Sequence, residues 1–319
     1  MNHRRRHFLG AVLAAPLLTG RVHAADKPLR IVVPFQSGSA TDTAARIIGE
    51  NLSRSLSRSV VIDNKPGAEG LIAVREVMKS DPSGDVLLFS TNTAITGINT
   101  FNAKPFYDPL TDLSPIGRVG EFPFLLVVNT SLPFTTARAF VEYARANPKK
   151  LTYASGSSSS IVAMAQLMGM AGLELHHIPY NSEPPAVVDL VGGRIDVMFA
   201  TPTTTMGFIK EGKARALMTT TRTRLEQFPD VPTMTDSGYT DMPLVPWGGF
   251  FGPPGMRPEL RRKLSGEINA VLARPDVAQA LAVHHISIST SGPDEFSAYL
   301  KEQLALSLQV VKEHGLTRK

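Results

Sequence analysis

Three loops rich in small hydroxyl residues hold the side chains of this sequence that could do chemistry. They run from Phe35 to Asp42, from Thr91 to Thr93 and from Ser155 to Ser160. Each follows a predicted strand, and the first and third also open a predicted helix. Hydroxyl groups beside the free N–H groups of a helix N-terminus can receive an anion, helped by the helix dipole. The loops therefore point to an anion-binding site, although ordinary helix capping by Ser39, Thr41 or Ser160 explains any one loop taken alone.

Asp42 also has two interpretations. In the first turn of a helix, an aspartate is stabilised by the helix dipole, an effect of roughly 0.3–1 kcal/mol. As a ligand contact, its carboxylate could instead accept a hydrogen bond from an amino or hydroxyl group. Its position in the first turn favours the capping interpretation.

The elements that position these loops alternate between strand and helix. Strands are predicted at 29–33, 60–62, 86–90, 125–128, 151–154, 175–178, 195–199, 214–219 and 248–252. Helices are predicted at 41–56, 71–79, 137–146, 161–172, 185–191, 203–211, 258–273 and 293–314. The continuous apolar run Leu29–Val33 is typical of a parallel strand buried on both faces. The alternation predicts an α/β architecture with parallel sheets, in which ligands bind at the carboxyl ends of the strands.

Enzymatic signatures are absent from the sequence. It contains no G-x-S-x-G, H-E-x-x-H, P-loop or G-x-G-x-x-G motif. The adjacent pairs His176-His177 and His284-His285 would point their rings to opposite faces of a strand, so neither pair chelates well. There is no cysteine, which excludes disulfides, thiolate metal sites and a cysteine nucleophile. We therefore expect a binding protein without a metal or cofactor, and not an enzyme.

The first 24 residues have the order of a secretory signal. Arg4, Arg5 and Arg6 precede an apolar run from Phe8 to Leu18, and Val22-His23-Ala24 is an A-x-A-like cleavage site. The adjacent arginines suggest the twin-arginine export route. The apolar run is too short to span a bilayer, which needs about 20 residues. We expect cleavage near Ala24-Ala25 and a mature protein outside the cytoplasm.

Removing this segment nearly neutralises the chain. Four of the 33 basic residues lie in this segment, so the remaining chain has 29 basic and 28 acidic residues. No basic surface for nucleic acid is then indicated. No later apolar run reaches 18 residues, so we expect no membrane insertion, and no N-terminal cysteine is available for lipid attachment. An unanchored binding protein would diffuse away from a cell with one membrane, so the periplasm is the expected location.

Seven segments, in order, resemble the Bug-type extracytoplasmic solute receptors of tripartite tricarboxylate transporters. They are IVVPFQSGSATD, VIDNKPGAEG, ANPKKLTYASG, HIPYNSEPPAVVDLVGGRIDVMF, GKARAL, FPDVPTMTDSG and FFGPPG, and the resemblance covers Lys27 to Leu316. It implies a type II periplasmic-binding-protein fold, with two doubly wound α/β domains around a central ligand cleft. Residues 25–127 and 247–319 would form domain 1 and residues 128–246 domain 2, with chain crossings near 125–129 and 245–251.

The resemblance also implies a site in which backbone amides, small hydroxyls and water hold a ligand carboxylate between the domains. Carried over by position, the domain 1 contacts are Phe35, Ser37, Gly38, Ser39, Ala40, Thr41, Asp42, Thr91, Asn92 and Thr93. Those of domain 2 are Ser155, Gly156, Ser157, Ser158, Ser159, Ser160, Tyr180, Asn181, Ser182 and Thr201.

Three departures from the family pattern bear on the ligand. Gln36-Ser37-Gly38-Ser39 stands where the family usually has Pro-Pro-Gly-Gly, Val162 where it has a histidine, and Tyr180-Asn181-Ser182 where it has Tyr-Lys-Gly. The last two changes remove groups that can carry positive charge. With the apolar Phe35, Ile95 and Val162, they predict a small carboxylate with an apolar or aromatic portion rather than a tricarboxylate.

The resemblance implies a monomeric receptor that hands this carboxylate to the small and large membrane subunits of a transporter. An orphan receptor that signals through a periplasmic sensor domain is the alternative, because it would have the same pocket.

Overall fold

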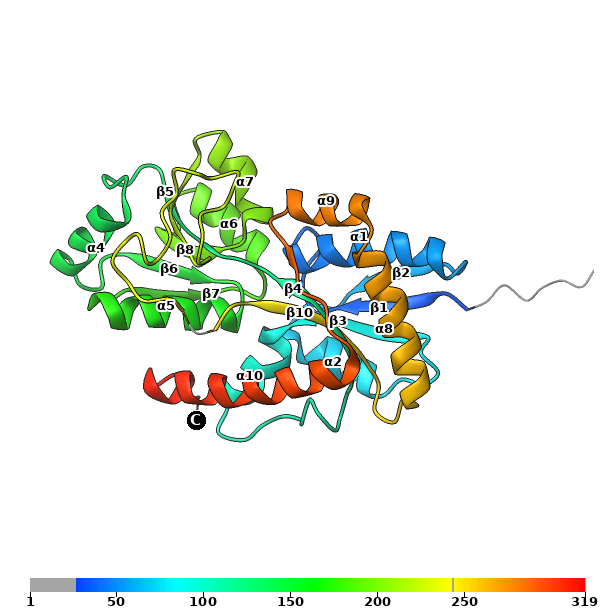
Figure 1. Cartoon of the computed structure of the whole chain (residues 1–319). Coiled ribbons are helices and arrows are strands. Elements are labelled where there is room, and N and C mark those ends of the chain that lie inside the picture. The colour runs from blue at the N-terminus through cyan, green and yellow to red at the C-terminus, as the bar shows by residue number, and fades with distance from the viewer. Residues whose placement is uncertain (1–26, 243, 319) are drawn as a thin grey trace, which may run out of the picture.

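Two α/β lobes lie side by side in the computed structural model, which describes residues 27–242 and 244–318 (Figure 1). The first lobe is built on a six-stranded sheet and the second on a five-stranded sheet. This arrangement confirms the predicted pair of α/β units. The predicted signal segment, residues 1–24, lies outside the described residues.

The sheet of the first lobe has the strand order β11-β4-β10-β3-β1-β2. Its strands are β1 (Leu29–Val33), β2 (Val60–Asn64), β3 (Val86–Thr91), β4 (Ser114–Glu121), β10 (Trp247–Gly252) and β11 (Ser287–Ile288). β1 pairs in parallel with β2 and β3, whereas β10 runs antiparallel to both β3 and β4. The sheet is therefore mixed, which corrects the prediction of parallel sheets.

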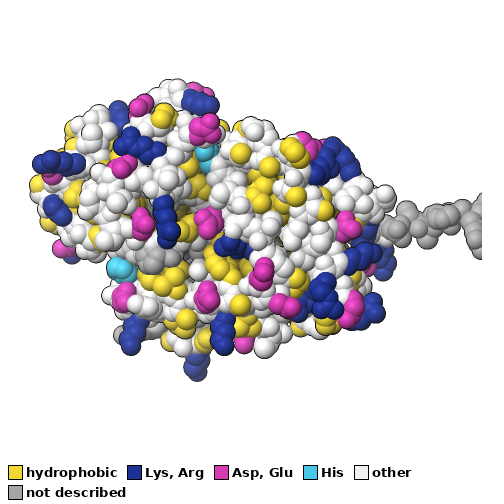
Figure 2. Space-filling model, in the orientation of Figure 1, with side chains coloured by type: hydrophobic (Ala, Val, Ile, Leu, Met, Phe, Trp, Pro, Cys, Tyr) yellow, Lys and Arg dark blue, Asp and Glu magenta, His cyan; other side chains and the backbone are white. Residues whose placement is uncertain are grey.

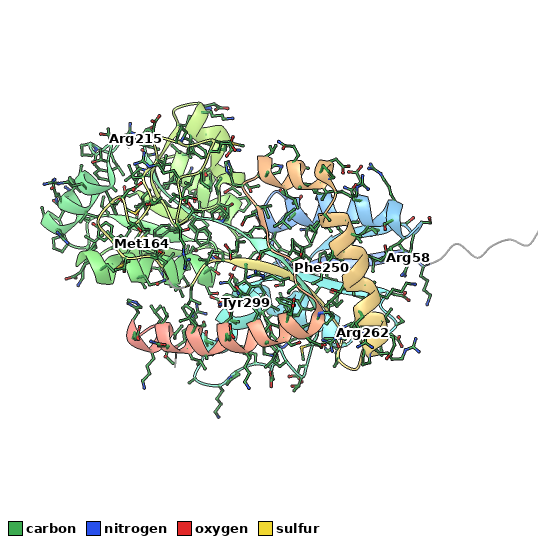
Figure 3. The ribbon with its side chains drawn as sticks, viewed as in Figure 1. Arg58, Met164, Arg215, Phe250, Arg262 and Tyr299 are labelled. Atoms are coloured by element: carbon green, nitrogen blue, oxygen red, sulfur yellow. The ribbon has the colours of Figure 1, made fainter. Side chains whose placement is uncertain are left out.

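Helices cover both faces of this sheet. One face carries α1 (Ala40–Ser55), α8 (Pro258–Leu272) and α9 (Pro275–Val283), and the other carries α2 (Leu71–Met78) and α10 (Pro293–Glu313). Each face of the sheet packs against its helices in a separate hydrophobic core. Ile31 of β1 packs into one core and Val32 into the other, and both are fully buried. Phe250 lies near the middle of the lobe in β10 (Figure 3). The apolar run of β1 thus has the double burial that its sequence predicted.

The second lobe repeats this plan with the order β7-β6-β8-β5-β9. Its strands are β5 (Leu125–Asn129), β6 (Thr152–Ser155), β7 (His176–Pro179), β8 (Val197–Ala200) and β9 (Ala214–Thr219). Its helices are α4 (Ala137–Ala146) and α5 (Ser158–Ala171) on one face, and α6 (Glu183–Val191) and α7 (Pro202–Lys210) on the other. Met164 of α5 is fully buried in the core (Figure 3). β5 runs antiparallel to β8 and β9, so this sheet is mixed as well.

Strand β4 has no counterpart among the predicted elements. It is mostly buried, but its sequence SPIGRVGE contains two glycines and no continuous apolar run. A Cβ at Gly120 would lie 1.8 Å from the Ser287 carbonyl oxygen, and one at Gly117 would lie 2.8 Å from that of Ser291. The close approach of the chain around β11 therefore requires glycine, a residue depleted in strands. Because this contact requires glycines, the strand lacks the continuous apolar run by which it could have been predicted.

The chain passes from the first lobe to the second between Glu121 and Leu125. The whole of β5 belongs to the second sheet, so the boundary predicted between Val127 and Val128 would cut through a strand. Pro123 lies in this crossing and has no N–H to donate to a strand ladder. On the return path the Phe122 N–H donates to the Pro246 carbonyl oxygen at 2.8 Å, so the two crossing segments run side by side.

Charged side chains of both signs are interspersed over both lobes on the face shown in Figure 2. No helix within residues 27–242 and 244–318 is both long enough and apolar enough to cross a membrane.

Candidate ligand-binding cleft

Both lobes line a small cavity, here called the inner cavity, beside the crossing segments. The first lobe and the crossings contribute Phe35, Ser39, Ala40, Thr41, Thr91, Asn92, Thr93, Phe122, Phe124 and Pro246. The second lobe contributes Gly156, Ser157, Ser159, Ser182, Glu183 and Thr201. The three hydroxyl-rich loops, far apart in the sequence, therefore meet at one place. This is the arrangement expected at the carboxyl ends of strands β1, β3 and β6.

Two helix N-termini border the inner cavity. Ser39 caps α1, and its side chain accepts a hydrogen bond from the Asp42 N–H at 3.2 Å. Ser157 caps α5 in a capping box with Ser160. The N–H groups in the first turn of a helix have no acceptor within that helix, and the helix dipole makes this end positive. Two such ends at one cavity can hold an anion without a lysine or arginine.

Asp42 does not line the cavity. Its buried carboxylate accepts hydrogen bonds from the Gly38 N–H at 2.9 Å, from Asn64 at 2.9 Å and from Arg46 at 3.0 Å. Burial opposes ionisation of the Asp42 carboxyl, but the hydrogen bonds from Arg46, Gly38 and Asn64 outweigh it and lower its pKa. Asp42 therefore holds the loop that precedes α1 in shape.

A second, larger cavity, here called the outer cavity, adjoins the first. Its volume is about 240 Å³ against about 50 Å³ for the inner cavity. The two share Phe35, Thr93, Gly156 and Ser157. The remaining lining residues of the outer cavity are Ala68, Glu69, Ser155, Ile161, His177, Pro179, Tyr180, Asn181 and Arg318.

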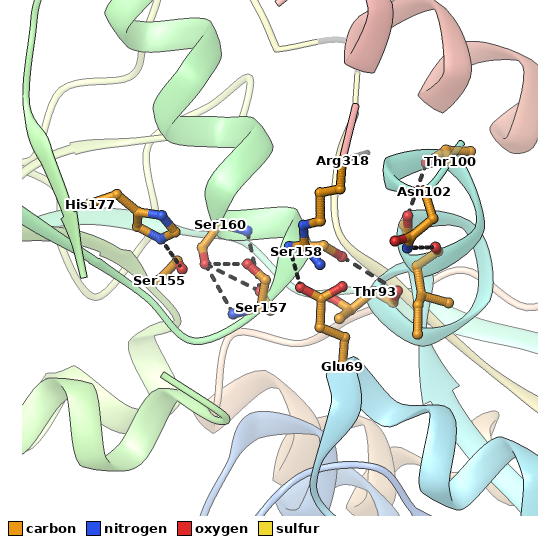
Figure 4. Close-up of polar contacts among 12 residues, drawn as sticks. Glu69, Thr93, Thr100, Asn102, Ser155, Ser157, Ser158, Ser160, His177 and Arg318 are labelled. Atoms are coloured by element: carbon orange, nitrogen blue, oxygen red, sulfur yellow. Dashed lines mark hydrogen bonds and ion pairs between the residues drawn. The ribbon is translucent and has the colours of Figure 1, made fainter. Parts of the chain in front are cut away.

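Polar contacts fix the walls of the outer cavity (Figure 4). Arg318 forms an ion pair with Glu69, and the Ser155 hydroxyl lies 2.6 Å from His177 Nε2. Burial lowers the pKa of His177, and the charges of Arg318 and His176 lower it further. Neutral His177 can then both accept and donate a hydrogen bond at this wall.

The lobes touch directly across the cavities. The Thr93 hydroxyl of the first lobe lies 2.9 Å from the Ser159 hydroxyl of the second, and Ser158 Oγ donates to the Thr93 carbonyl oxygen at 3.4 Å (Figure 4). Behind this contact, a Cβ on Gly97 would lie only 2.2 Å from Ser158 Oγ. The lobes are therefore in direct contact in this structure, and the glycine permits their close approach.

A second contact between the lobes involves the histidine pair. The Thr203 hydroxyl donates to the His284 carbonyl oxygen at 3.0 Å, and the His285 ring packs 5.5 Å from that of Phe228. Burial lowers the pKa of His285, as do the charges of His284 and Lys210.

We predict that acidification weakens this contact. Because the folded pKa of His285 lies below the unfolded value of 6.5, the unfolded state binds more protons between the two values, and stability falls as pH drops through that window. The midpoint of thermal unfolding should decrease between pH 7.5 and 5.0, and less steeply in His285→Asn. The same substitution at the exposed His176 should leave the slope unchanged; an unchanged slope in His285→Asn would contradict the prediction.

The predicted site residues divide into four groups by their positions. The inner cavity receives Phe35, Ser39, Ala40, Thr41, Thr91, Asn92, Thr93, Gly156, Ser157, Ser159, Ser182 and Thr201. Ser155, Tyr180 and Asn181 line only the outer cavity. Ser158 lies at the contact between the lobes. The loop and cap residues Ser37, Gly38, Asp42 and Ser160 line neither cavity.

Sequence reasoning missed Phe122, Phe124, Glu183 and Pro246. The two phenylalanines and Pro246 belong to the crossing segments, whose place beside the cleft follows from the fold rather than from a motif. Glu183 is the first residue of α6, where an acid is ordinary for a helix N-terminus. Within the described ranges, no group of three or more His, Asp or Glu side chains is placed to hold a metal ion.

The chain is similar to a known receptor family and to several solved structures. The model of the tripartite tricarboxylate transporter family receptor matches residues 44–316. The structure of periplasmic binding protein BugD superposes with a TM-score of 0.87 at 28% identity, covering 92% of this chain and 99% of that one. Rpa4515 of R. palustris, solved with adipate, gives a TM-score of 0.86 at 27% identity, with coverages of 90% and 97%. MatC of Rhodopseudomonas palustris, solved with bound malate, gives 0.82 at 25% identity, with coverages of 89% and 98%.

These matches extend over nearly the whole of both lobes, and the family is one of solute receptors. The chain therefore belongs to the tripartite tricarboxylate transporter receptor family and is a solute-binding receptor with the periplasmic-binding-protein fold, not an enzyme.

Proposed function

We propose that this receptor captures a small carboxylate between its lobes and delivers it to the small and large membrane subunits of a tripartite tricarboxylate-type transporter. The observation that carries the proposal is the inner cavity, where the N-termini of α1 and α5 meet from opposite lobes. The relatives solved with adipate and malate, both dicarboxylates, support the same ligand class.

Hydrogen bonds alone can supply the affinity. A micromolar dissociation constant corresponds to about 8 kcal/mol. Hydrogen bonds to a charged group contribute roughly 1.5–3 kcal/mol each, so five or six can reach that total after the costs of ordering and closure. Backbone amides of the two helix ends and the nearby hydroxyls offer that many donors.

The ligand would carry an apolar portion. The rings of Phe35, Phe122 and Phe124 line the inner cavity. Two of the apolar residues expected from the sequence do not line the inner cavity: Ile95 is buried in the core of the first lobe, and Val162 packs in a separate cluster. Phe122 and Phe124 of the crossing segments line the cavity instead.

A titration of purified residues 25–319 with a carboxylate library tests the function. Saturable binding by calorimetry and thermal shift is expected for at least one monocarboxylate or dicarboxylate, with about 2.7 kcal/mol of stabilisation at a hundredfold excess over its dissociation constant. Binding of sugars or metal ions alone, with no carboxylate bound, would overturn the ligand class. Tighter binding of citrate than of monocarboxylates would overturn the expected apolar portion. Transport by reconstituted membrane subunits then tests delivery.

We further propose that the protein works as a monomer in the periplasm and that residues 1–24 direct it there by the twin-arginine route. Replacing Arg5 and Arg6 by lysine should abolish export, because that route depends on the arginine pair. The measurement is the amount of processed protein in the periplasmic fraction, compared with a strain that lacks the pathway. Undiminished export of the lysine variant would show that the general secretory route is used.

A further inference from the structure

The inner cavity has one ionisable side chain among its described lining residues, and that side chain is acidic. It is Glu183, at the start of α6. The other lining residues are neutral, and none is lysine, arginine or histidine. A negative charge at this place would not help to bind a plain carboxylate. The position of Glu183 therefore suggests a ligand that also carries a positive group.

The surroundings of Glu183 keep it in position and leave one oxygen for a ligand. Its Oε1 accepts three hydrogen bonds, from the Thr201 N–H at 3.0 Å and from the hydroxyls of Thr201 and Thr204. All hydrogen bonds that the structure shows to this carboxyl end on Oε1. Oε2 is the oxygen that remains to accept a hydrogen bond from a bound molecule.

The start of α6 differs from the other two helix ends at the cavity. Pro184 and Pro185 follow Glu183 directly, and proline has no N–H. This end therefore lacks two of the amides that would hold an anion, and it carries a carboxyl group instead. One side of the cavity, at α1 and α5, suits a negative group, and the side at α6 suits a positive one.

Two residues that line the cavity also carry a buried polar atom without a partner in the part of the chain that the structure describes. Asn92 Oδ1 and Ser182 Oγ have no hydrogen-bond partner among the described residues, and the two residues are 7% and 0% exposed. Both residues line the inner cavity. An amide oxygen can only accept a hydrogen bond, and burial without a donor is costly.

We propose that the ligand is a small amino carboxylate whose protonated amine binds at Glu183 and whose carboxylate binds at the N-termini of α1 and α5. The inference rests on the proposed function and narrows its ligand class. A second ligand carboxylate at this side would meet the charge of Glu183 and would be repelled unless a proton were shared.

Burial raises the pKa of Glu183, while hydrogen bonds from Thr201 and Thr204 partly oppose the shift. A ligand ammonium group beside the Glu183 carboxyl would favour the ionised form of that carboxyl. The carboxylate would in turn stabilise the protonated amine of the ligand.

Matched ligand pairs test the proposal on the unmodified mature protein. Calorimetric titrations would compare 4-aminobutanoate with butanoate, L-leucine with 4-methylpentanoate, and L-phenylalanine with 3-phenylpropanoate. In at least one pair the amino compound is expected to bind about tenfold tighter or more, as a charge-assisted hydrogen bond should provide. Equal or tighter binding of the plain acid in every pair would overturn the inference while leaving the proposed function intact. If neither member of any pair binds, and no other carboxylate does, both fail.

The variant Glu183→Gln removes the charge and retains the shape and the acceptor oxygen. It should abolish the preference for the amino compound, measured as the ratio of the two dissociation constants within each ligand pair. Glu211→Gln is the matched control, because Glu211 lies in the same lobe, is exposed and pairs with Lys213 away from the cavity. A preference that survives in Glu183→Gln would assign the amine to another group. If the variant does not fold, the ligand pairs still decide.

Discussion

Replacing Gly97 by alanine is expected to weaken ligand binding at least about tenfold while leaving the unliganded protein folded. A Cβ at this position would lie 2.2 Å from Ser158 Oγ and 3.1 Å from Ser158 Cβ. Real side chains essentially never approach so closely, and Ser158 belongs to the opposite lobe. The lobes can avoid the clash by staying apart, so the variant is trapped toward the open form. Ligand contacts that need both lobes are then lost, and affinity should fall at least about tenfold, or 1.4 kcal/mol.

The measurement is ligand affinity by calorimetry together with unfolding of the unliganded variant. Gly266→Ala is a matched control, because the space around Gly266 in α8 is open; it should bind ligand normally and gain slightly in stability. The double variant Gly97→Ala with Ser158→Gly removes the opposing side chain and should recover much of the affinity. Normal affinity in Gly97→Ala alone would show that the ligand-bound form is more open than the structure.

Replacing Phe250 by alanine is expected to cost about 3–5 kcal/mol of unfolding free energy. Phe250 is fully buried in β10, between β3 and β4, and its ring lies 4.7 Å from that of Phe89. The cavity left by the ring would lie among packed side chains of the sheet and α8, which have little freedom to collapse into it. Since domains are commonly stable by only 5–15 kcal/mol, little margin would remain.

Urea unfolding of the mature protein measures this loss. Phe106→Ala serves as the control, because Phe106 is 48% exposed and its ring lies 5.9 Å from the Arg75 guanidinium at the surface; the loss of unfolding free energy there should be about 1 kcal/mol or less. A loss below about 1.5 kcal/mol at Phe250 would mean that the first lobe repacks readily around β10.

The sequence predicted the elements whose apolar pattern is set by their own residues. The strand predicted at 29–33 and the helix predicted at 41–56 are of this kind, and both are present, as β1 and α1. Strand β4 could not be predicted, since Gly117 and Gly120 are required by chain segments more than 160 residues away. The antiparallel strands in each sheet could not be predicted for a related reason. The direction of β5 and β10 depends on how the chain crosses between the lobes, and the local apolar pattern contains no information about that.

The hydroxyl-rich loops could be located because their residue types are unusual at the ends of strands. Their convergence on one cavity followed from the general rule for α/β sheets. Asp42 illustrates the limit, since the same residue type suits a helix cap and a ligand contact, and only the hydrogen bonds from Gly38, Arg46 and Asn64 assign it to the loop. Glu183 shows the opposite case, an ordinary first-turn acid that the fold turns toward the cavity.

The paired crossing segments have a kinetic consequence. Phe122, Phe124 and Pro246 belong both to the connection between the lobes and to the wall of the inner cavity. Points near a rotation axis move least, so a ligand can rest against these residues before the lobes come together. If the lobes close by rotation about these segments, Thr93 and Ser159, which meet from opposite lobes, would make contact last. Arrival rate and residence time would then depend on different residues.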